Sequence, residues 1–293
     1  MNDGSAEVMA GSSVSVAMTG TQPFRFDRFD PAEVAHGIAG RHGGVSDAPF
    51  TSLNLSVKTE DKRERVGENR RRFERLMGFE TRQAAFGRLS HGCAVTVFQL
   101  GGLLPPMAPP DLGWPMFDSD AAISNVPGLF LLMTFADCVP VLLWDRENRA
   151  CALIHAGWRG TALRIASTTV EAMKDSFGTN PIRIEAGIGP SIGPECYPVG
   201  ESVRDEFVNA YGQKAEDFFA EAQLDLWQAN RFDLESVGVR TDNIDIAGIC
   251  TACHRDEYFS HRADSGSTGR FGACIGIRYP GRFGMRPAAP SPA

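Results

Sequence analysis

This sequence has little that would suggest a membrane, nucleic-acid-binding or exported protein. Its longest apolar runs fall far short of the roughly 18 residues that cross a bilayer. The formal net charge is −7 and the isoelectric point about 5.4, so no overall positive charge attracts nucleic acid or an anionic membrane. Residues 1–22 have neither a basic start nor a continuous apolar segment, which argues against a secretory signal. We therefore expect a cytoplasmic protein with no nucleic-acid or membrane partner.

The cysteines do not form the pattern of a disulfide framework. There are seven of them, an odd number, in a chain long enough to build its own core. Without an export signal, we expect reduced thiols. Cys151 and Cys274 lie inside apolar runs, where a free cysteine usually serves as a small buried hydrophobic residue.

What the sequence does contain is the composition of a globular protein. Hydrophobic residues make up 43% and charged residues 22% of the 293 residues, a length that suits one large domain or two small ones. Residues 1–22 are rich in Gly, Ser, Ala and Met and predict a disordered N-terminal tail. Residues 280–293 are rich in Pro and Gly and predict a loose C-terminal tail.

Hydrophobic periodicity changes repeatedly between that of strands and that of helices. Apolar residues from Leu163 to Phe177 recur at intervals of three and four, which predicts an amphipathic helix with Thr161 as N-cap and Gly178 just beyond its end. The expected helices are 58–77, 161–177, 201–211 and 224–237. The expected strands are 84–100, 129–135, 150–155, 181–189, 244–249 and 273–278.

Two of these apolar runs end on reactive side chains. Leu129–Phe135 leads to Asp137 and Cys138, and Cys151–Ile154 leads to His155. Small residues or a proline follow each of them, which is how many folds place reactive groups at a sheet edge. Cys138 and His155 are therefore candidates for a metal site, for a nucleophile with its base, or for core packing.

The turn GWRG after His155 carries a candidate anion site. Because we expect a helix to start there, Arg159 and free backbone N–H groups would meet at a helix N-terminus. Such an end attracts anions. The alternative is that Arg159 makes a surface salt bridge.

His91 is a candidate third partner for Cys138 and His155. It lies 47 residues before Cys138, which in turn lies 17 residues before His155. Two imidazoles and one thiolate suit Zn²⁺ and leave a fourth position open. Asp137 would then be a supporting carboxylate or a general base. Since none of these spacings is that of a local metal-binding pair, a metal-free Cys–His pair and simple packing stay open.

A second motif, Cys250-Thr-Ala-Cys253-His254, matches the c-type haem attachment pattern and one half of a zinc site. A c-type haem requires export, which residues 1–22 do not support. No second pair of cysteines completes a four-cysteine zinc site. We therefore expect neither group at this motif.

Four motifs, in order, resemble the YfiH family. They are TFADCVPVLLWD, HAGWRG, GIGPSIGPECYPVG and CTACHRDEYFSHRADSGSTGR, and the resemblance runs from Gly37 to Arg278, with GGVS, SLNL and VGENRRRF near the start. Members are also called laccase-domain proteins, multicopper polyphenol oxidases, peptidoglycan-editing factors and purine nucleoside phosphorylases. The resemblance implies a single catalytic domain, 23–279, with an α/β (α+β) fold. This fold is a four-layer α/β/β/α sandwich with mixed sheets, similar to that of cytotoxic necrotizing factor catalytic domains.

The resemblance also implies a site and an activity. The His–Cys–His metal ligands of the family correspond to His91, Cys138 and His155, with zinc as the expected metal and copper as the alternative. The implied reactions are phosphorolysis of adenosine, inosine and methylthioadenosine, and deamination of adenosine. Catalysis would involve Cys138, His155 and Asp137. Beyond the resemblance, we hypothesise that Arg159 and Arg262, together with Asn54 and Gly160, bind substrate or phosphate, and we expect a monomer or small homo-oligomer.

One departure from the family pattern concerns the segment before His91. This chain has Leu89-Ser90 where the family usually has Gln-Val, so any role of that glutamine is missing here.

Three alternatives to the implied activity stay open. A cysteine hydrolase that edits peptidoglycan precursors would use Cys138 as nucleophile, His155 as base and Asp137 or Asp120 to orient it. A polyphenol oxidase would need a type-1 copper and separate His-rich centres, which six histidines cannot supply, although copper on a two-His, one-Cys site would allow weak oxidase activity. A binding protein would use the same site without turnover.

Overall fold

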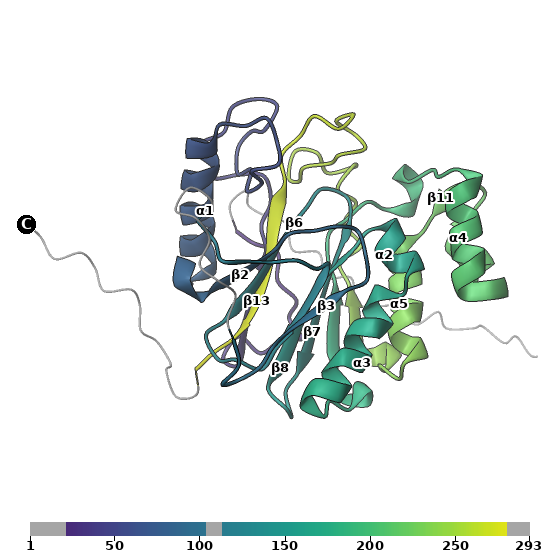
Figure 1. Ribbon diagram of the computed structural model, residues 1–293. Coiled ribbons are helices and arrows are strands. Elements are labelled where there is room, and N and C mark those ends of the chain that lie inside the picture. Colours follow the sequence, from purple (N-terminus) through teal and green to yellow (C-terminus); the bar gives the residue numbers. More distant parts are fainter. Residues whose placement is uncertain (1–21, 104–112, 280–293) are drawn as a thin grey trace, which may run out of the picture.

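Two mixed β-sheets packed face to face form the centre of the molecule, seen in a computed structural model that describes residues 22–103 and 113–279 (Figure 1). The five-stranded sheet has the order β1-β13-β6-β2-β4, and the six-stranded sheet the order β12-β9-β7-β8-β5-β3. Each contains parallel and antiparallel pairs. The expected mixed α/β fold is confirmed in this respect, while the similarity to cytotoxic necrotizing factor domains and the single-domain boundary stay predictions.

The elements follow the order of the sequence. The strands are β1 (Val34–Ile38), β2 (Ala84–Gly87), β3 (Val95–Phe98), β4 (Met116–Phe117), β5 (Ala121–Ser124), β6 (Phe130–Phe135), β7 (Val139–Asp145), β8 (Ala150–Ala156), β9 (Glu185–Ile188), β10 (Phe219–Ala220), β11 (Gln223–Leu224), β12 (Ile244–Ile246) and β13 (Phe271–Ile277). The α-helices are α1 (Arg63–Met77), α2 (Trp158–Ala162), α3 (Ile165–Phe177), α4 (Glu201–Tyr211) and α5 (Leu226–Ser236). The predicted tails, 1–22 and 280–293, lie outside the described residues except for Gln22.

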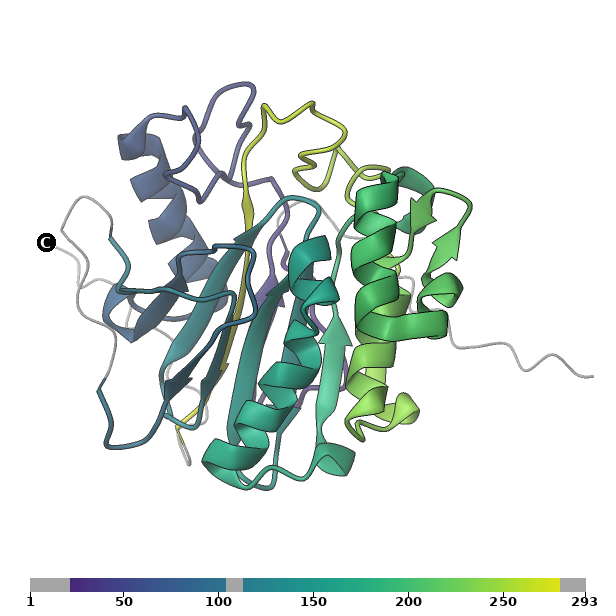
Figure 2. The same ribbon diagram turned by 45° about the vertical axis from the view of Figure 1, so that its right-hand side comes forward.

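The central strands of the six-stranded sheet are buried on both faces. Every residue of β7 and β8 is buried. On one face, Leu142, Trp144 and Leu153 pack against the five-stranded sheet. On the other face, alternate residues such as Val141 and Leu143 pack under α3 and α5, which cover the sheet in Figure 2. This double coverage explains the nearly continuous apolar runs that predicted these strands.

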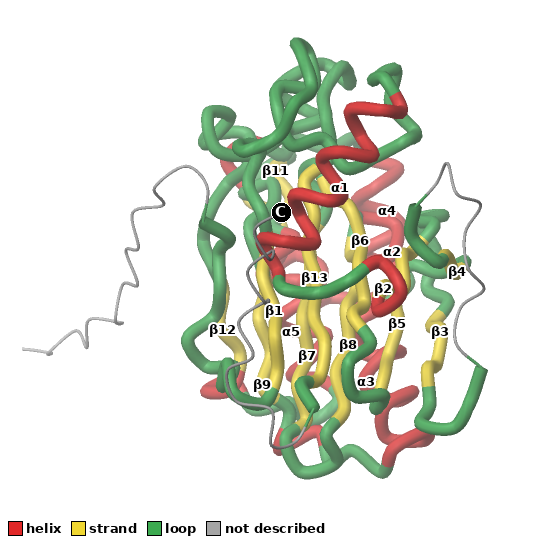
Figure 3. Tube along the Cα trace, turned by 90° about the vertical axis from the view of Figure 1, so that its left-hand side faces the viewer, coloured by secondary structure: helices red, strands yellow, loops and turns green. Residues whose placement is uncertain are grey.

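Helix α1 covers the outer face of the five-stranded sheet, as Figure 3 shows from that side. Phe73 and Met77 contact a core that includes Leu132 of β6 and Cys274 of β13. The outward face forms ion pairs, among them Arg71 and Arg72 with Glu68. The charged segment 58–77 is therefore a solvated helix, although the helix starts at Arg63 and not at residue 58.

Two expected elements are broken in the structure. The strand predicted for 84–100 is β2 and β3 with a loop between them. The helix predicted for 161–177 is divided into α2 and α3 at Arg164, whose φ is 60°. The carboxylate of Asp233 stabilises this break because it accepts hydrogen bonds from Arg164 Nε and from the N–H of Ser167.

The break changes the expected helix ends. The N-cap of α2 is Gly157 and not Thr161, whose N–H already donates to the Gly157 carbonyl. Leu163, expected on the core face, is 52% exposed. Gly178, with a φ of 72°, ends α3 as predicted. Among the described residues, no helix has both the length and the apolarity needed to cross a membrane.

His36 of β1 gives the fold a pH dependence. Its Nε2 accepts the N–H of Phe26 at 2.9 Å, and burial lowers the pKa of His36 to about 3. In the unfolded chain this group takes up a proton near pH 6.5. Its contribution to stability is therefore complete above pH 6.5 and is lost progressively as the pH falls towards 3.

We expect the free energy of unfolding to fall by up to about 2 kcal/mol more in the wild type than in His36→Gln between pH 7 and pH 5. Glutamine keeps an acceptor for Phe26 but does not titrate. Urea unfolding at both pH values gives the four free energies needed. Equal losses in both proteins would show that His36 is not the group responsible.

Candidate metal centre

The β7–β8 hairpin brings Cys138 and His155 together. The strands are antiparallel, with Val139 opposite Ala156 and Pro140 opposite His155. Cys138 directly precedes β7 and His155 is the next-to-last residue of β8. Their separation of 17 residues in sequence is therefore closed by strand pairing, at the end of the sheet where β6 passes into β7.

His91 reaches the same place from the loop between β2 and β3, and Asp120 holds that loop. Its two carboxylate oxygens accept hydrogen bonds from the N–H groups of Ser90, His91 and Gly92 at 2.9–3.0 Å. The Ser90 hydroxyl adds a bond of 2.8 Å. His91 has a φ of 63°, a backbone conformation that a continuous strand does not allow. Asp120 thus explains both the break in the predicted strand and the position of His91.

Asp120 also orients the second imidazole. Its Oδ1 lies 3.0 Å from His155 Nδ1, which leaves the other ring nitrogen of His155 to face the cluster. Burial raises the pKa of Asp120, but the bonds from His155, Gly92 and Ser90 outweigh burial and hold the pKa below its usual range. Asp120 is therefore an anion fixed between the two histidines.

The three side chains form a set that fits a zinc ion. The ligand atoms of His91, Cys138 and His155 all lie within 4.8 Å of one another. A tetrahedral ion with bonds of about 2.0–2.3 Å needs ligand atoms separated by roughly 3.3–3.8 Å, which small side-chain movements provide. Three ligands leave one coordination position for substrate or water.

The electrostatics of the site favour a thiolate at Cys138. Burial raises the pKa of the Cys138 thiol, but the neighbouring His155 and His91 outweigh burial and lower it. Burial lowers the pKa of His155, but Cys138 and Asp120 outweigh burial and raise it. The thiolate is the form that binds metals, and also the form that acts as a nucleophile.

Gly157 keeps the space beside the thiolate open. A Cβ at this position would lie 2.9 Å from Cys138 Sγ and 3.6 Å from His91 Cδ2. Any larger residue would therefore push against the Cys138 sulfur, while its distance to His91 would be that of an ordinary van der Waals contact. The glycine in HAGWRG is explained by this close approach.

Asp137 ties the site to three distant segments. Its φ is 88°, and its carboxylate accepts bonds from the Thr251 hydroxyl at 2.7 Å and from the Arg262 N–H at 2.6 Å. Its backbone carbonyl accepts the N–H of Ile192. Both carboxylate oxygens are therefore engaged, and Asp137 is placed to position these loops around Cys138.

Two of the candidate anion-binding residues, Arg159 and Arg262, are exposed beside aromatic rings. The guanidinium of Arg159 lies 4.3 Å from the ring centre of Trp158, and that of Arg262 lies 4.7 Å from the ring centre of Tyr197. Arg262 also donates to the Pro198 carbonyl. Burial, followed by the nearby Cys138, raises the pKa of Tyr197 to about 12. Tyr197 is therefore a protonated hydroxyl close to both arginines and to the cluster.

The other two candidate substrate-binding residues have structural partners. The Asn54 side chain is fully buried and donates to Ser56, Thr59 and Asp61. Its oxygen accepts the N–H of Arg270. Gly160 is buried, and a Cβ there would lie 3.2 Å from the Gly92 carbonyl. The structure thus places Asn54 under the 255–270 loop and Gly160 against the loop that carries His91.

Arg270 is a residue that the sequence did not single out. Burial lowers the pKa of Arg270, while Cys138 and Asp137 act in the opposite direction. It donates to the carbonyls of Thr268 and Gly269. The only signal in the sequence was its place in the glycine-rich segment before β13.

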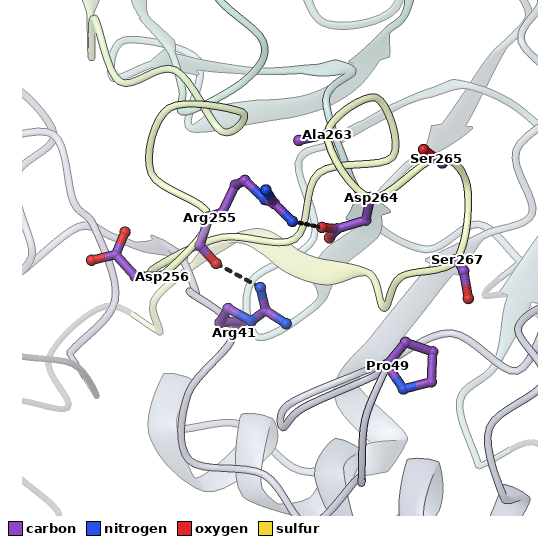
Figure 4. A pocket seen from close by; sticks show the side chains of 8 residues that line it. All are labelled: Arg41, Pro49, Arg255, Asp256, Ala263, Asp264, Ser265 and Ser267. Carbon is purple, nitrogen blue, oxygen red and sulfur yellow. Dashed lines mark hydrogen bonds and ion pairs between the residues drawn. The ribbon is translucent and has the colours of Figure 1, made fainter.

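A wide polar cavity of about 630 Å³ lies between the loops 41–49 and 255–267, near the same end of the sheets (Figure 4). Arg255 forms an ion pair with Asp264 at 2.7 Å across it, and Arg41 donates to the Arg255 carbonyl. None of the three candidate metal ligands lines this cavity. We therefore locate the chemistry at the cluster and not at this cavity.

The sequence and the fold of this chain are similar to those of known proteins. The sequence profile of a family described as multi-copper polyphenol oxidoreductase laccase matches residues 35–278. The purine nucleoside phosphorylase of Deinococcus radiodurans is 37% identical over 245 residues, which cover 83% of this chain and 89% of that protein.

The purine nucleoside phosphorylase YfiH of Escherichia coli is 33% identical over 248 residues, which cover 84% of this chain and 94% of that protein. The crystal structure of YlmD from Geobacillus stearothermophilus superimposes with a TM-score of 0.77 at 32% identity, covering 87% of this chain and 94% of that one. With the family profile matched over most of its length and relatives at this level of identity, the chain belongs to the YfiH family.

Proposed function

We propose that this protein is a purine nucleoside phosphorylase that uses a zinc ion held by His91, Cys138 and His155, with adenosine deamination as a second activity. The observation that carries this proposal is the three-ligand cluster with an open fourth position in a chain whose relatives are named purine nucleoside phosphorylases. When bound, the zinc ion supplies a Lewis acid beside the substrate.

The residues around the cluster suit phosphorolysis. In this reaction a phosphate oxygen bonds to C1′ of the ribose, while the bond from C1′ to the purine nitrogen breaks and leaves its electron pair on the base. Arg159 and Arg262 place two guanidinium groups for the phosphate, which such groups bind through paired N–H donors. Tyr197 keeps its proton at neutral pH because its pKa is about 12, so its hydroxyl can donate a hydrogen bond to the bound anion.

Asp120 and Asp137 act as positioning residues. Asp120 fixes the ring nitrogen that His155 presents. Asp137 holds the backbone of Arg262 and the Thr251 hydroxyl, and so sets the distance of the phosphate-binding side from Cys138.

The experiment that tests this function uses the full chain loaded with zinc and incubated with adenosine, with and without phosphate. Adenine and ribose 1-phosphate should form only with phosphate, and inosine should form without it. Chromatography separates adenine from inosine. Absence of both products would contradict the proposed activity.

Arg159→Ala should raise the KM for phosphate and lower the kcat/KM of phosphorolysis about 10- to 100-fold, or about 1.4–2.7 kcal/mol. Deamination, which uses no phosphate, should change little. The matched control is Arg183→Ala, since Arg183 is exposed and precedes β9 at the opposite end of the sheet. If phosphate KM is unchanged in both Arg159→Ala and Arg262→Ala, the anion site lies elsewhere.

The cysteine-hydrolase alternative has one observation in its favour, which is the Cys138 thiolate next to His155. His91→Ala separates the two functions. A metal-dependent phosphorylase loses zinc and activity, whereas a hydrolase that uses only Cys138 and His155 keeps its activity on a peptidoglycan precursor. For the copper oxidase, the described residues contain one cluster with histidines, and a laccase requires separate His-rich centres.

A further inference from the structure

A second cluster of metal-binding side chains lies outside the proposed active site. Cys250 and Cys253 are the cysteines of the motif that lacked a second pair in the sequence. The fold adds Glu195 and Cys196, which come from the short 3₁₀ turn η3 (Pro194–Cys196). The four ligand atoms all lie within 4.8 Å of one another.

Backbone pairing explains how two distant segments meet. Ser191 and Cys250 form a parallel β-bridge. The Ser191 N–H donates to the Ile249 carbonyl, and the Thr251 N–H donates to the Ser191 carbonyl. Because these bonds fix the two backbone segments that carry the cysteines, the cluster does not depend on flexible side chains alone.

The distances within the cluster are close to those of a zinc site. Cys196 Sγ lies 3.4 Å from Cys253 Sγ, and Cys253 Sγ lies 3.6 Å from Glu195 Oε1. Zinc–sulfur bonds of about 2.3 Å in a tetrahedron set the sulfur atoms roughly 3.8 Å apart. Glu195 and Cys253 are exposed while Cys250 is buried, so an ion has a path from solvent to the innermost thiol.

A backbone N–H group points at the Cys250 sulfur. The N–H of Gly193 donates to Cys250 Sγ at 3.2 Å, a bond that strengthens when the sulfur is charged. A Cβ on Gly193 would lie 2.5 Å from Glu195 Oε1, so a larger residue there would displace the carboxylate from its present position. Thiolate ligands select zinc over magnesium or calcium.

We propose that Cys196, Cys250, Cys253 and Glu195 bind a second, structural zinc ion. Four protein ligands close the coordination sphere, which is the arrangement of a structural site and not of a catalytic one. From the sequence we considered only a second pair of cysteines, whereas the structure brings one cysteine and one glutamate to the motif from a loop that begins 55 residues before Cys250.

The position of this ion gives it a role in the proposed active site. Tyr197 directly follows Cys196, and Thr251 directly follows Cys250 and donates to Asp137. A zinc ion bound by both Cys196 and Cys250 would therefore fix the positions of Tyr197 and Thr251 next to the first cluster. The inference itself rests on the four ligands and holds whatever reaction the protein catalyses.

The test is the zinc content of the purified full-length protein and of variants, measured by mass spectrometry of the metal. The wild type should contain about two zinc ions per chain, one in each cluster. Cys253→Ser and Cys196→Ser should each lose one equivalent, and so should His91→Ala, from the other site. The control Cys274→Ala removes a thiol in β13, outside both clusters, and should keep both.

Cobalt substitution provides a second measurement, because the spectrum of bound Co²⁺ reports the thiolate ligands directly and not only the amount of metal in each variant. Co²⁺ bound to His91→Ala should show the strong near-ultraviolet charge-transfer band of several thiolates, and this band should be lost when Cys253→Ser is added. The proposal would be overturned if the cobalt-loaded wild type showed the charge-transfer band of a single thiolate. It would also be overturned if Cys253→Ser contained as much zinc as the wild type. A disulfide between Cys196 and Cys253 in the freshly purified protein, seen as a mass lower by two hydrogens, would overturn it as well.

Discussion

Cys138→Ala should lower the kcat/KM for adenosine phosphorolysis by about 10³-fold or more, which corresponds to about 4 kcal/mol of transition-state stabilisation. Cys138 supplies the thiolate of the His91–Cys138–His155 cluster. Its removal leaves two imidazoles, which hold zinc much less tightly. Deamination should be lost with phosphorolysis, because the proposed function assigns both activities to the same ion. Steady-state kinetics and zinc content of the same preparations measure the effect.

The matched control is Cys151→Ala. Cys151 lies in β8, the strand that also carries His155, but it is buried between the sheets, and burial raises the pKa of its thiol. This variant should keep zinc and activity apart from a modest loss of stability. Cys138→Ala with normal zinc content and normal kcat/KM would rule out the cluster as the catalytic centre.

Asp120→Ala should have the second-largest effect, because it changes the site and the fold together. We expect zinc affinity at the first cluster to fall about 10- to 100-fold, as for other residues that orient a metal-binding histidine. The free energy of unfolding should fall by roughly 3–5 kcal/mol, since removal of a buried charge leaves its partners unpaired. Those partners are the N–H groups of residues 90–92, the Ser90 hydroxyl and His155.

Two further variants separate the effect of the Asp120 charge from the effect of its shape and hydrogen bonds. Asp120→Asn keeps the shape of the side chain but not its charge, so it should retain more stability than Asp120→Ala while still losing zinc affinity. Asp118→Asn changes an exposed carboxylate two residues away, paired with Arg88, and should be close to neutral. Urea unfolding with and without a chelator, together with zinc titration, measures both quantities. Unchanged zinc affinity in Asp120→Ala would contradict the role given to Asp120.

Local patterns predicted the elements that carry the site. The apolar runs before Cys138 and His155 are β6 and β8, because strands covered on both faces need continuous hydrophobic sequence. The periodicity of 163–177 correctly predicted a helix whose last residue is Phe177. It did not predict the break at Arg164, because the hydrogen bonds that stabilise the break come from Asp233, 69 residues away from Arg164.

The sequence by itself determined which chemical groups this protein has available. It offered a cysteine and two histidines as candidate metal ligands, an arginine at the start of a predicted helix, and a Cys-x-x-Cys motif. Only the tertiary structure decided that Asp120 orients His155 and holds the His91 loop, and that Glu195 and Cys196 meet Cys250 and Cys253. The physical reason is that periodicity reports contacts a few residues apart, whereas these partners are 28 to 58 residues apart and meet only through strand register and loop hydrogen bonds.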